Sequence, residues 1–506
     1  MAFTSGIPAA LQPTQSKALY TGNYIDFTDS SFNQWAQQFL PDVYEQEVER
    51  YGNRSIGSFL RMVSAEMPST SDQIIWTEQG RLHTRYANII YLSNAGTMPT
   101  TGTTPAAANA VTTGGNVGNF FVPTAQPTSL GVTSQGTTAV NFRKGQTVMI
   151  QAQSSATSAV GGTGAMIKGI VTNVSGQYFQ VKSLTGVPAI TTAERFTALA
   201  YGSEFAKGTG NFNEKLDPSY ATFTNSPIIL KEHYSINGSD TAQIGWIEVT
   251  SENGASGYLW YLKSEHETRL RFDDYLETAM IEAVPAEAGS GAIAAAGDVG
   301  NKGSEGIFYV VENRGNVWGG GNPAALADFD AIISRLDKQG SIEENVIFVD
   351  RDFGFDIDDM LAAQNSYGAG GTSYGLFDND KDMALNLGFT GFRRGYDFYK
   401  SDWKYLNDPT MRGGLPTGAN SGRVNGLLVP AGSTTVYDQI LGKNAKRPFL
   451  HVRYRASETE DRRYKTWITG SAGGARTSDL DAMEVNFLSE RAVCTLGANN
   501  FFLFQE

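Results

Sequence analysis

A change of composition divides this sequence more sharply than any other feature. From Ala95 to about Asp217 the chain is rich in Gly, Thr, Ala and Ser, and its seven basic and four acidic side chains give a net charge of +3. Because the whole chain has a formal net charge of −13, the rest carries −16. Short apolar stretches separated by turn residues such as Ser175-Gly176 are typical of a small β-barrel. We therefore expect an inserted all-β domain at 95–217, with strands at Thr147–Ile150, Lys168–Val171 and Tyr178–Val181.

The segments on either side of this insertion have the composition of strands. β-branched and aromatic residues are frequent between Ser71 and Leu92 and again between Tyr220 and Ser235. A domain inserted at a loop tip begins and ends between two neighbouring strands. We expect Trp76–Leu92 and Tyr220–Ser235 to form the two halves of one hairpin.

The strongest helical pattern follows this second flank. Asn253 or Ser256 can cap a helix that continues to about Ala283 and ends before Pro285. At about 1.5 Å per residue it would be roughly 40 Å long. Its apolar stripe is expected to contain Leu259, Leu262, Phe272, Leu276, Met280 and Ala283.

Both helices and strands are expected in the rest of the chain. The first thirty residues are polar, with little apolar periodicity. Helices are expected from Ser30 or Ser31 to Leu40, at Val43–Tyr51, at Ile56–Ser64, after an Asn322 cap with Pro323 in first position, and at Ile357–Ala363. Strands are expected at Ile307–Val311, Val346–Val349, Phe449–Tyr454, Lys465–Thr469, Met483–Leu496 and Phe501–Phe504.

Length and charge limit the possible classes of protein. A chain of 506 residues exceeds what one core usually organises, so two or more packed units are expected. The net charge of −13 argues against a protein whose main task is to coat nucleic acid. The single cysteine, Cys494, excludes an internal disulfide framework and fits a reducing cytoplasm. Neither a signal peptide nor a membrane-spanning run is visible, so we expect a soluble protein with no membrane partner.

Metal-binding patterns are incomplete. His266-Glu267 begins like a zinc-protease motif but lacks the second histidine, and His83, His233, His266 and His451 share no metal-ligand spacing. Asp350-Arg351-Asp352-Phe353-Gly354 resembles a calcium loop, but Leu361 stands where the final carboxylate belongs. Capping of a helix by Asp352 or Asp356 is the favoured interpretation. Asp378-Asn379-Asp380-Lys381-Asp382 is expected to be a solvated turn.

Catalytic patterns are equally weak. Gly319-Gly320-Gly321-Asn322 lacks the Lys-Ser/Thr of a phosphate-binding loop. Gly371-Thr372-Ser373-Tyr374-Gly375 has the spelling of a nucleophile elbow, but Gly368-Ala369-Gly370 precedes it where a strand is required. Cys494 lies in an apolar strand and is expected in a core. We therefore expect no enzyme, no catalytic, cofactor-binding or metal-binding residues, and no cofactor.

One basic run remains as a candidate contact surface. It contains Arg453, Arg455, Arg462, Arg463 and Lys465, partly balanced by Glu458, Glu460 and Asp461. Salt bridges to a neighbouring protein are favoured over contact with packaged DNA.

The order of these parts resembles the major capsid protein of tailed bacteriophages with the Hong Kong 97-type fold. Two stretches carry the resemblance: Ile56–Val63 leading to Ile74-Ile75-Trp76, and Phe487-Leu488-Ser489-Glu490-Arg491-Ala492 followed by Gly497-Ala498-Asn499. Within the family, the text is most similar to capsid subunits of crAss-like phages. The resemblance implies an α+β fold in six parts. They are an N-arm at 1–50, the start of the P-domain and first E-loop strands at 51–94, the inserted domain at 95–217, the E-loop return and P-domain spine helix at 218–306, an A-domain at 307–441, and C-terminal P-domain strands at 442–506.

The resemblance also implies a function. Such a subunit self-assembles into hexamers and pentamers of an icosahedral head shell that encloses double-stranded DNA. Its partners would be other capsid, portal and auxiliary head proteins, with weak non-specific contact to the packaged DNA. It would be assembled in the host bacterial cytoplasm and reside in the virion.

Three alternatives stay open. A tail-tube or sheath protein would stack helically and have no long spine helix. A secreted β-rich adhesin would need a secretion signal. An enzyme is the weakest alternative, because the catalytic patterns are poor.

Overall fold

The computed structural model describes residues 60, 65–83, 85–98, 115–123, 140–153, 166–187, 195–212, 215–216, 220–242, 249–250, 256–257, 260–286, 301–366, 390–416, 422–438, 443–472 and 476–506. The chain is a mixed α+β protein in which strands predominate. It divides into two compact units, one formed by 1–75 with 224–506 and the other by 76–223. The N-terminal helices expected before Leu60, and the motifs at 371–375 and 378–382, lie outside the described residues.

The first unit contains a five-stranded sheet built around one long strand. β22 (Ala482–Thr495) pairs with β10 (Ile228–Asn237) on one side and with β20 (Leu450–Arg455) and β21 (Lys465–Gly470) on the other. β1 (Ala65–Ser69) adds to β20 in parallel. The strands expected at 449–454, 465–469 and within 483–496 are thus confirmed to within one or two residues.

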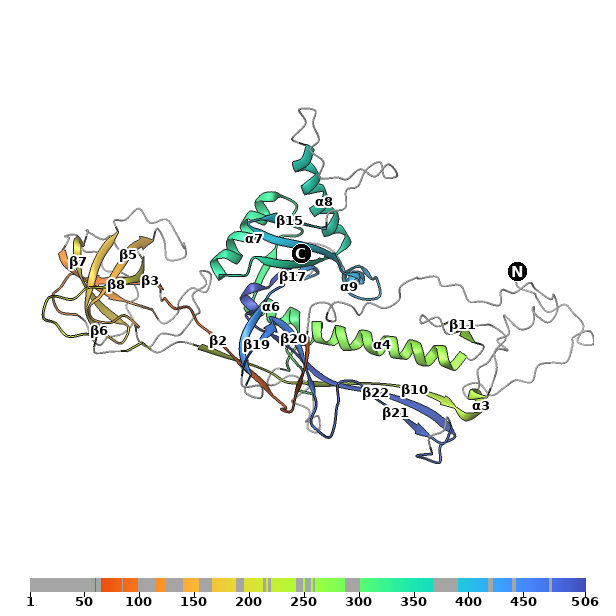
Figure 1. Ribbon diagram of the computed structural model, residues 1–506. Helices are drawn as coiled ribbons and strands as arrows, with labels where there is room; N and C mark the ends of the chain where they lie inside the picture. Colours follow the sequence, from red (N-terminus) through yellow and green to blue (C-terminus); the bar gives the residue numbers. More distant parts are fainter. Residues whose placement is uncertain are drawn as a thin grey trace, which may run out of the picture. The chain divides into compact units, whose positions relative to one another are not determined.

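The long helix α4 (Trp260–Glu282) lies along β10 and β22 (Figure 1). Phe272 and Leu276 are buried against Val485 and Phe487, because these side chains alternate onto one face of β22. The expected helix is confirmed, but it begins four residues later than Ser256, which lies in the short strand β12 (Ser256–Gly257). Leu262, expected in the apolar stripe, is 49% exposed.

A second sheet in this unit has six strands. Their order is β13 (Asn316–Gly319), β23 (Phe502–Gln505), β17 (Val424–Pro430), β14 (Glu344–Val349), β16 (Tyr396–Asp402) and β15 (Gly391–Arg394). Helices α7 (Leu326–Gln339) and α8 (Arg351–Ser366) bury Phe329, Leu336, Phe353 and Ile357 against one face. The other face contributes Phe348 and Leu427 to a core shared with the first sheet.

Three sequence expectations in this region need correction. Residues 307–311, expected as a strand, begin helix α6 (Ile307–Arg314). A run of five apolar residues buried on several sides does not distinguish a strand from a buried helix. Helix α7 begins after Ala325 and not after Asn322, whose side chain donates 2.7 Å to Asp356 Oδ2. Helix α8 is longer than the expected 357–363.

Shorter elements complete the described part of the first unit. They are α3 (Gly238–Thr241), β11 (Val249–Thr250), α9 (Lys404–Asn407), the 3-10 turns η3 (Arg412–Gly414) and η4 (Ala498–Asn500), and the hairpin β18 (Ser433–Asp438) with β19 (Lys443–Pro448).

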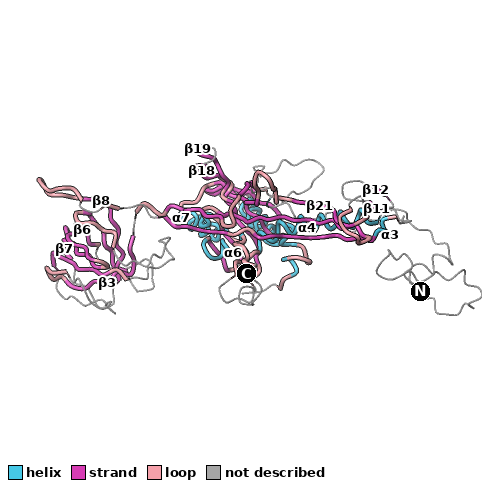
Figure 2. Tube along the Cα trace, turned by 90° about the horizontal axis from the view of Figure 1, so that it is seen from below, coloured by secondary structure: helices cyan, strands magenta, loops and turns pink. Residues whose placement is uncertain are grey.

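The second unit is a closed six-stranded barrel on a two-stranded ribbon (Figures 1 and 2). The strand order is β3 (Arg85–Ser93), β4 (Gly115–Phe121), β7 (Tyr178–Val187), β6 (Ile167–Ser175), β5 (Gln146–Gln153) and β8 (Arg195–Ser203), which returns to β3. Phe120, Phe179 and Phe196 fill its interior and are at most 1% exposed. The ribbon is formed by β2 (Ile74–Gln79) and β9 (Tyr220–Asn225).

The hairpin in the structure is therefore shorter than the one expected from Trp76–Leu92 and Tyr220–Ser235. Only β2 pairs with β9, whereas β3 is the first strand of the barrel and β10 belongs to the sheet of β22. The barrel thus begins before Ala95, at Arg85. The composition changes at 95, but Tyr86–Leu92 is apolar enough to belong to either the ribbon or the barrel. Composition therefore does not locate the boundary of the barrel.

None of the helices in the described part of the chain is long and apolar enough to cross a membrane.

Candidate functional site

The candidate metal and catalytic residues do not come together in the described part of the chain. His266 lies on α4, and its neighbour Glu267 is 3.9 Å from Lys263. His233 is on β10 and His451 is buried on β20. No group of three or more His, Cys, Asp or Glu side chains among the described residues is arranged to hold a metal ion. Cys494 is 1% exposed on β22, within the core of its unit.

The aspartates considered as a calcium loop begin helix α8 instead. Asp350 Oδ1 accepts a hydrogen bond of 2.7 Å from the Phe353 N–H, and Arg423 Nη2 lies 3.3 Å from Asp350 Oδ2. Asp350 is thus the capping residue, two positions earlier than expected, because it satisfies a free N–H of the first helical turn. Burial raises the pKa of the Asp350 carboxyl, against the lowering effects of Phe353 and Arg423.

The glycine-rich segment 319–322 ends strand β13 and leads to α7. Asn322 is held on both sides, since Asn425 Nδ2 donates 2.8 Å to Asn322 Oδ1 while Asn322 donates to Asp356. These bonds give the segment a structural role between β17 and α8.

The basic run is paired within the chain. Arg462 Nε lies 2.6 Å from Glu490 Oε2, and Arg463 Nε lies 2.5 Å from Glu66 Oε2. Arg455 pairs with Asp72 and Lys465 with Glu460, and Arg453 donates to the carbonyl oxygen of Pro68. Arg455, Arg462, Arg463 and Lys465 therefore each have an acidic partner in the same subunit.

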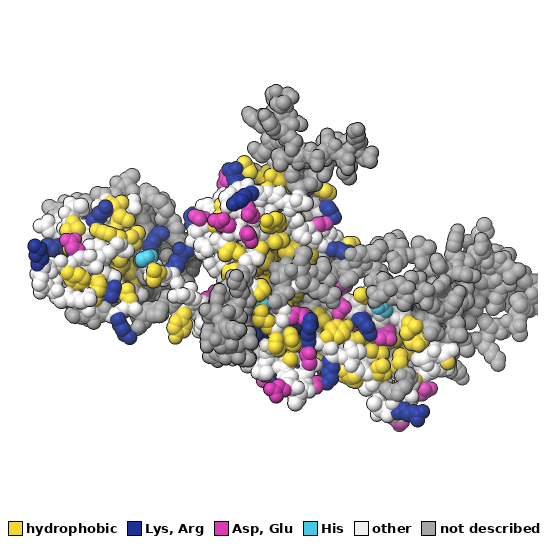
Figure 3. All heavy atoms as spheres, viewed as in Figure 1, with side chains coloured by type: hydrophobic (Ala, Val, Ile, Leu, Met, Phe, Trp, Pro, Cys, Tyr) yellow, Lys and Arg dark blue, Asp and Glu magenta, His cyan; other side chains and the backbone are white. Residues whose placement is uncertain are grey.

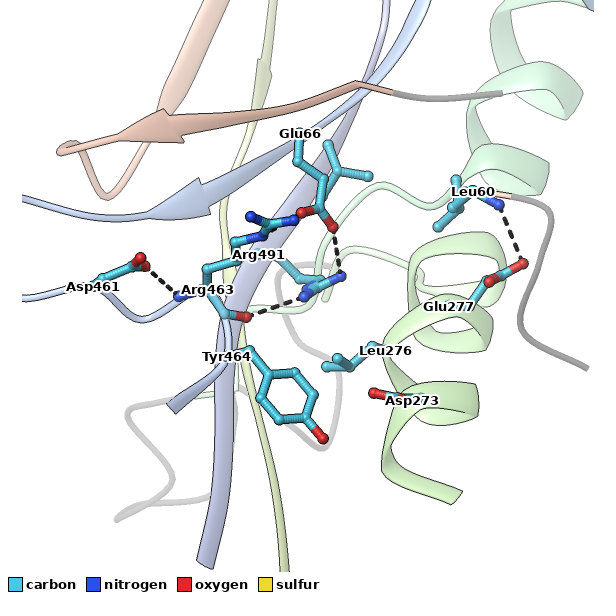
Figure 4. Close-up of a pocket in the computed structure, with 10 residues that line it drawn as sticks. Leu60, Glu66, Asp273, Leu276, Glu277, Asp461, Arg463, Tyr464 and Arg491 are labelled. Atoms are coloured by element: carbon cyan, nitrogen blue, oxygen red, sulfur yellow. Dashed lines mark hydrogen bonds and ion pairs between the residues drawn. The ribbon is translucent and has the colours of Figure 1, made fainter. Parts of the chain in front are cut away.

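A cavity of about 750 Å³ opens beside this run, between α4 and the sheet (Figure 4). Glu66 bridges Arg463 and Arg491, with Arg491 Nη1 at 3.5 Å. Arg491 Nε also donates 2.9 Å to Ser489 Oγ, and its Nη2 donates 3.1 Å to the carbonyl oxygen of Arg463. Across the cavity, Glu277 on α4 accepts 3.2 Å from the Leu60 N–H.

This arrangement ties elements together. Glu66 pairs with Arg463 and Arg491, which joins β1 to β22, and Glu277 joins α4 to Leu60. Among the described residues that line the cavity, none is a serine, cysteine or histidine. The roles of Glu66 and Glu277 and the pairing of Arg491 were not predicted from the sequence. The available signal was Arg491, a charged residue inside the largely apolar strand 482–495, because a buried arginine requires an acidic partner.

The ribbon of β2 and β9 is largely exposed. Ile75 is 58% exposed and Tyr220 is 69% exposed. On the ribbon, Trp76 packs on Phe223, with ring centroids 6.2 Å apart. A two-stranded ribbon is marginally stable by itself in water, so apolar side chains on its faces favour a partner surface.

No protein-family model matches the sequence, and no curated protein matches it. Solved structures are similar at low identity. A chain from Microbacterium phage Oxtober96 has 8% identity and a TM-score of 0.37, covering 93% of this chain and 97% of that one. A chain in the capsid of a native GTA particle has 9% identity and a TM-score of 0.34, covering 92% and 95%. A chain in the mature capsid of bacteriophage PhiM1 has 9% identity and a TM-score of 0.31, covering 60% and 78%.

Proposed function

We propose that this chain is a shell-forming major capsid protein of a tailed phage, with the Hong Kong 97-type partition of its sequence. In this proposal 1–50 is the N-arm, the β2–β9 ribbon belongs to the E-loop, α4 is the P-domain spine helix, 307–441 is the A-domain, and 442–506 returns to the P-domain. Subunits form the hexamers and pentamers of an icosahedral head that encloses double-stranded DNA. The resemblance of the quoted stretches to crAss-like capsid subunits supports this partition.

The exposed ribbon carries the proposal. A subunit that exposes apolar side chains on an extended ribbon, outside its own cores, gains stability when a neighbouring subunit covers them. Ile75 and Tyr220 are such side chains, and neither belongs to the described cores. Heterologous contacts of this kind close into rings when the rotation between subunits allows it.

The rigid helix α4 supports the same interpretation. Twenty-three residues of helix are fixed along β10 and β22 by Phe272, Leu276 and Phe487. Such an element holds the angle between two contact surfaces of one subunit. A tail-tube or sheath protein, the main alternative, would not need it.

Electron microscopy of the purified full-length chain tests the proposal. We expect closed polyhedral particles, whereas tubes would support the tail alternative and dispersed particles would contradict a shell. Ile75→Lys should abolish particles while leaving the subunit folded. Thr77→Lys is the matched control, because Thr77 is exposed two positions along the same strand and its only apolar group is one methyl.

A further inference from the structure

The barrel of the second unit carries charge opposite in sign to the rest of the chain. Residues 76–223 contain nine basic and five acidic side chains, a net charge of +4. With a total of −13, the residues of the first unit carry −17. Each copy therefore has a cationic module and a larger anionic one.

Part of this positive charge lies in an ordered row on the outside of the barrel. Lys168 on β6 pairs with Met149 on β5, Met149 with Leu199 on β8, and Leu199 with Arg85 on β3. Paired residues on neighbouring strands point to the same face of a sheet. The interior face holds Val148, Ala198 and Tyr86, so this row points outward.

Neighbouring residues extend the row on the next strand. Lys182 on β7 pairs with Ile170 on β6, and it is exposed. Leu184, two residues further along β7, is 58% exposed. The "cationic row" is hereafter Arg85, Leu199, Met149, Lys168, Lys182 and Leu184. Figure 3 shows basic and hydrophobic side chains side by side on the barrel face in view.

The cations of the row are unpaired within the described part of the chain. Neither Lys168 nor Lys182 has an ion-pair partner there, and Arg85 Nε is buried without a hydrogen-bond partner. Burial lowers the pKa of the Arg85 guanidinium. By contrast, the basic run near β20 is largely neutralised inside its own unit. A half-buried cation without a partner favours a contact that supplies a carboxylate.

The anatomy of the row fits a protein partner better than a nucleic acid. Leu199 and Met149 lie between Arg85 and Lys168 in the row, and Leu184 follows Lys182. Apolar side chains thus lie among the cations, a mixture that protein interfaces use. A phosphate-binding surface requires denser Lys and Arg than a net +4 over this unit.

We propose that the cationic row docks onto the anionic first unit of a second copy of this chain. The inference rests on the proposed shell function, because assembly places copies at high local concentration. Charge complementarity between +4 and −17 then fixes which unit of the neighbour is contacted.

Zero-length cross-linking of assembled full-length protein tests the contact. Equal parts of ¹⁴N- and ¹⁵N-labelled chain are mixed before assembly, and a carbodiimide then joins lysine amines to carboxylates in contact. We expect mixed-isotope peptides that join Lys168 or Lys182 to an Asp or Glu within 1–75 or 224–506. Cross-links of a single isotope only would place the contact inside one copy and overturn the proposal, as would none at these lysines.

Charge reversal provides an independent test. Lys168→Glu with Lys182→Glu should raise the subunit concentration needed for assembly by roughly tenfold at 0.1 M salt. Lys144→Glu with Lys207→Glu is the matched control, with the same charge change at exposed positions outside the row. The difference between the two double variants in the concentration needed for assembly should become smaller at 1 M salt, because screening shortens the range of electrostatic interactions to about 3 Å.

The outcomes separate the two proposals. If the wild type forms no particles, the shell function fails and the docking fails with it. If the wild type assembles and both double variants behave alike, only the docking is wrong. Equal thermal midpoints of the dispersed subunits exclude misfolding as the cause of a difference.

Discussion

The side-chain amide of Asn225 donates a hydrogen bond of 2.7 Å to the carbonyl oxygen of Val493, 268 positions later in the chain. The same Nδ2 donates 3.0 Å to the Glu305 carbonyl oxygen. Asn225 Oδ1 accepts from Ser304 Oγ and from the backbone N–H groups of Ser226 and Glu305. Five hydrogen bonds on one side chain fix the end of β9 within the first unit, to which Asn225 and all its partners belong.

Asn225→Asp should therefore destabilise the first unit by about 3 kcal/mol, because a carboxylate would face two carbonyl oxygens with no proton to donate. Urea unfolding of the dispersed subunit measures the loss. Asn211→Asp is the control, since Asn211 is exposed and should change stability by less than about 0.5 kcal/mol. Equal effects of the two substitutions would show that the Asn225 bonds contribute little.

Leu276→Pro should break α4 and prevent assembly. Leu276 is 5% exposed against Phe487 and Val485, and proline removes a hydrogen bond and clashes with the preceding turn, at a cost of about 3 kcal/mol or more. Val284→Pro, just after the helix and 59% exposed, should be tolerated. Normal particles from Leu276→Pro, seen by electron microscopy, would count against the role of α4.

The Asp350 carboxyl should give the protein a pH-dependent stability. Its raised pKa means that the folded state favours the protonated form. The stabilising contribution is therefore complete below the unfolded pKa of about 3.9 and is lost as pH rises through the folded pKa. Asp350→Asn keeps a capping oxygen without the charge, so its stability should fall less over that rise in pH.

Asp350→Ala is the contrasting variant, because it removes the cap and should cost about 1 kcal/mol at neutral pH. Thermal unfolding from pH 4 to 8 compares both variants with the wild type. An unchanged pH profile in Asp350→Asn would show that another group titrates.

Replacing the barrel with a short Gly/Ser linker between Gln79 and Tyr220 should leave the first unit folded but weaken the shell. The barrel has its own aromatic core, and the described cores of the first unit do not draw on it. These end points differ from 95–217, because removal of 95–217 alone would delete β4 and β8, the partners of β3. Ile89 and Tyr91 on β3 would then be exposed to water. Circular dichroism tests folding, and sedimentation at rising denaturant tests the shell.

In the proposed shell we expect the barrel on the outer side, because an inner position would take volume from the proposed DNA content. A density map of particles tests the placement, and barrel density on the inner wall would refute it.

Deleting Met1 to Ser30 should leave a folded subunit that no longer forms stable shells. This polar segment has too little apolar periodicity for a core, so its contribution would arise between subunits. Analytical ultracentrifugation with circular dichroism distinguishes the outcomes. Loss of folded monomer would place the segment in the core.

Elements with a strong local signal were accessible from the sequence. The helix ending before Pro285 and the alternation of Met483, Val485 and Phe487 were predicted because burial on one face imposes a period on the sequence. The strand Val346–Val349 was predicted as a continuous apolar run, and it lies within Glu344–Val349. Composition indicated the β-rich insertion for a different reason, because turn residues separate its short strands. Local chemistry was less decisive at element ends, where Asp350 and Ala325 precede helices expected to begin elsewhere.

Only the tertiary structure decided the pairings. Residues 307–311 are apolar enough for strand or helix, and their burial against Met280 and Ile281 of α4 selects the helix. Tyr86–Leu92 could have continued the ribbon, but β8 pairs with it and closes the barrel. Glu66 and Arg491, 425 positions apart, meet because β1 and β22 both pair with β20. Sequence periodicity records which face of a segment is buried, whereas the identity of the covering segment depends on contacts between residues far apart in the chain.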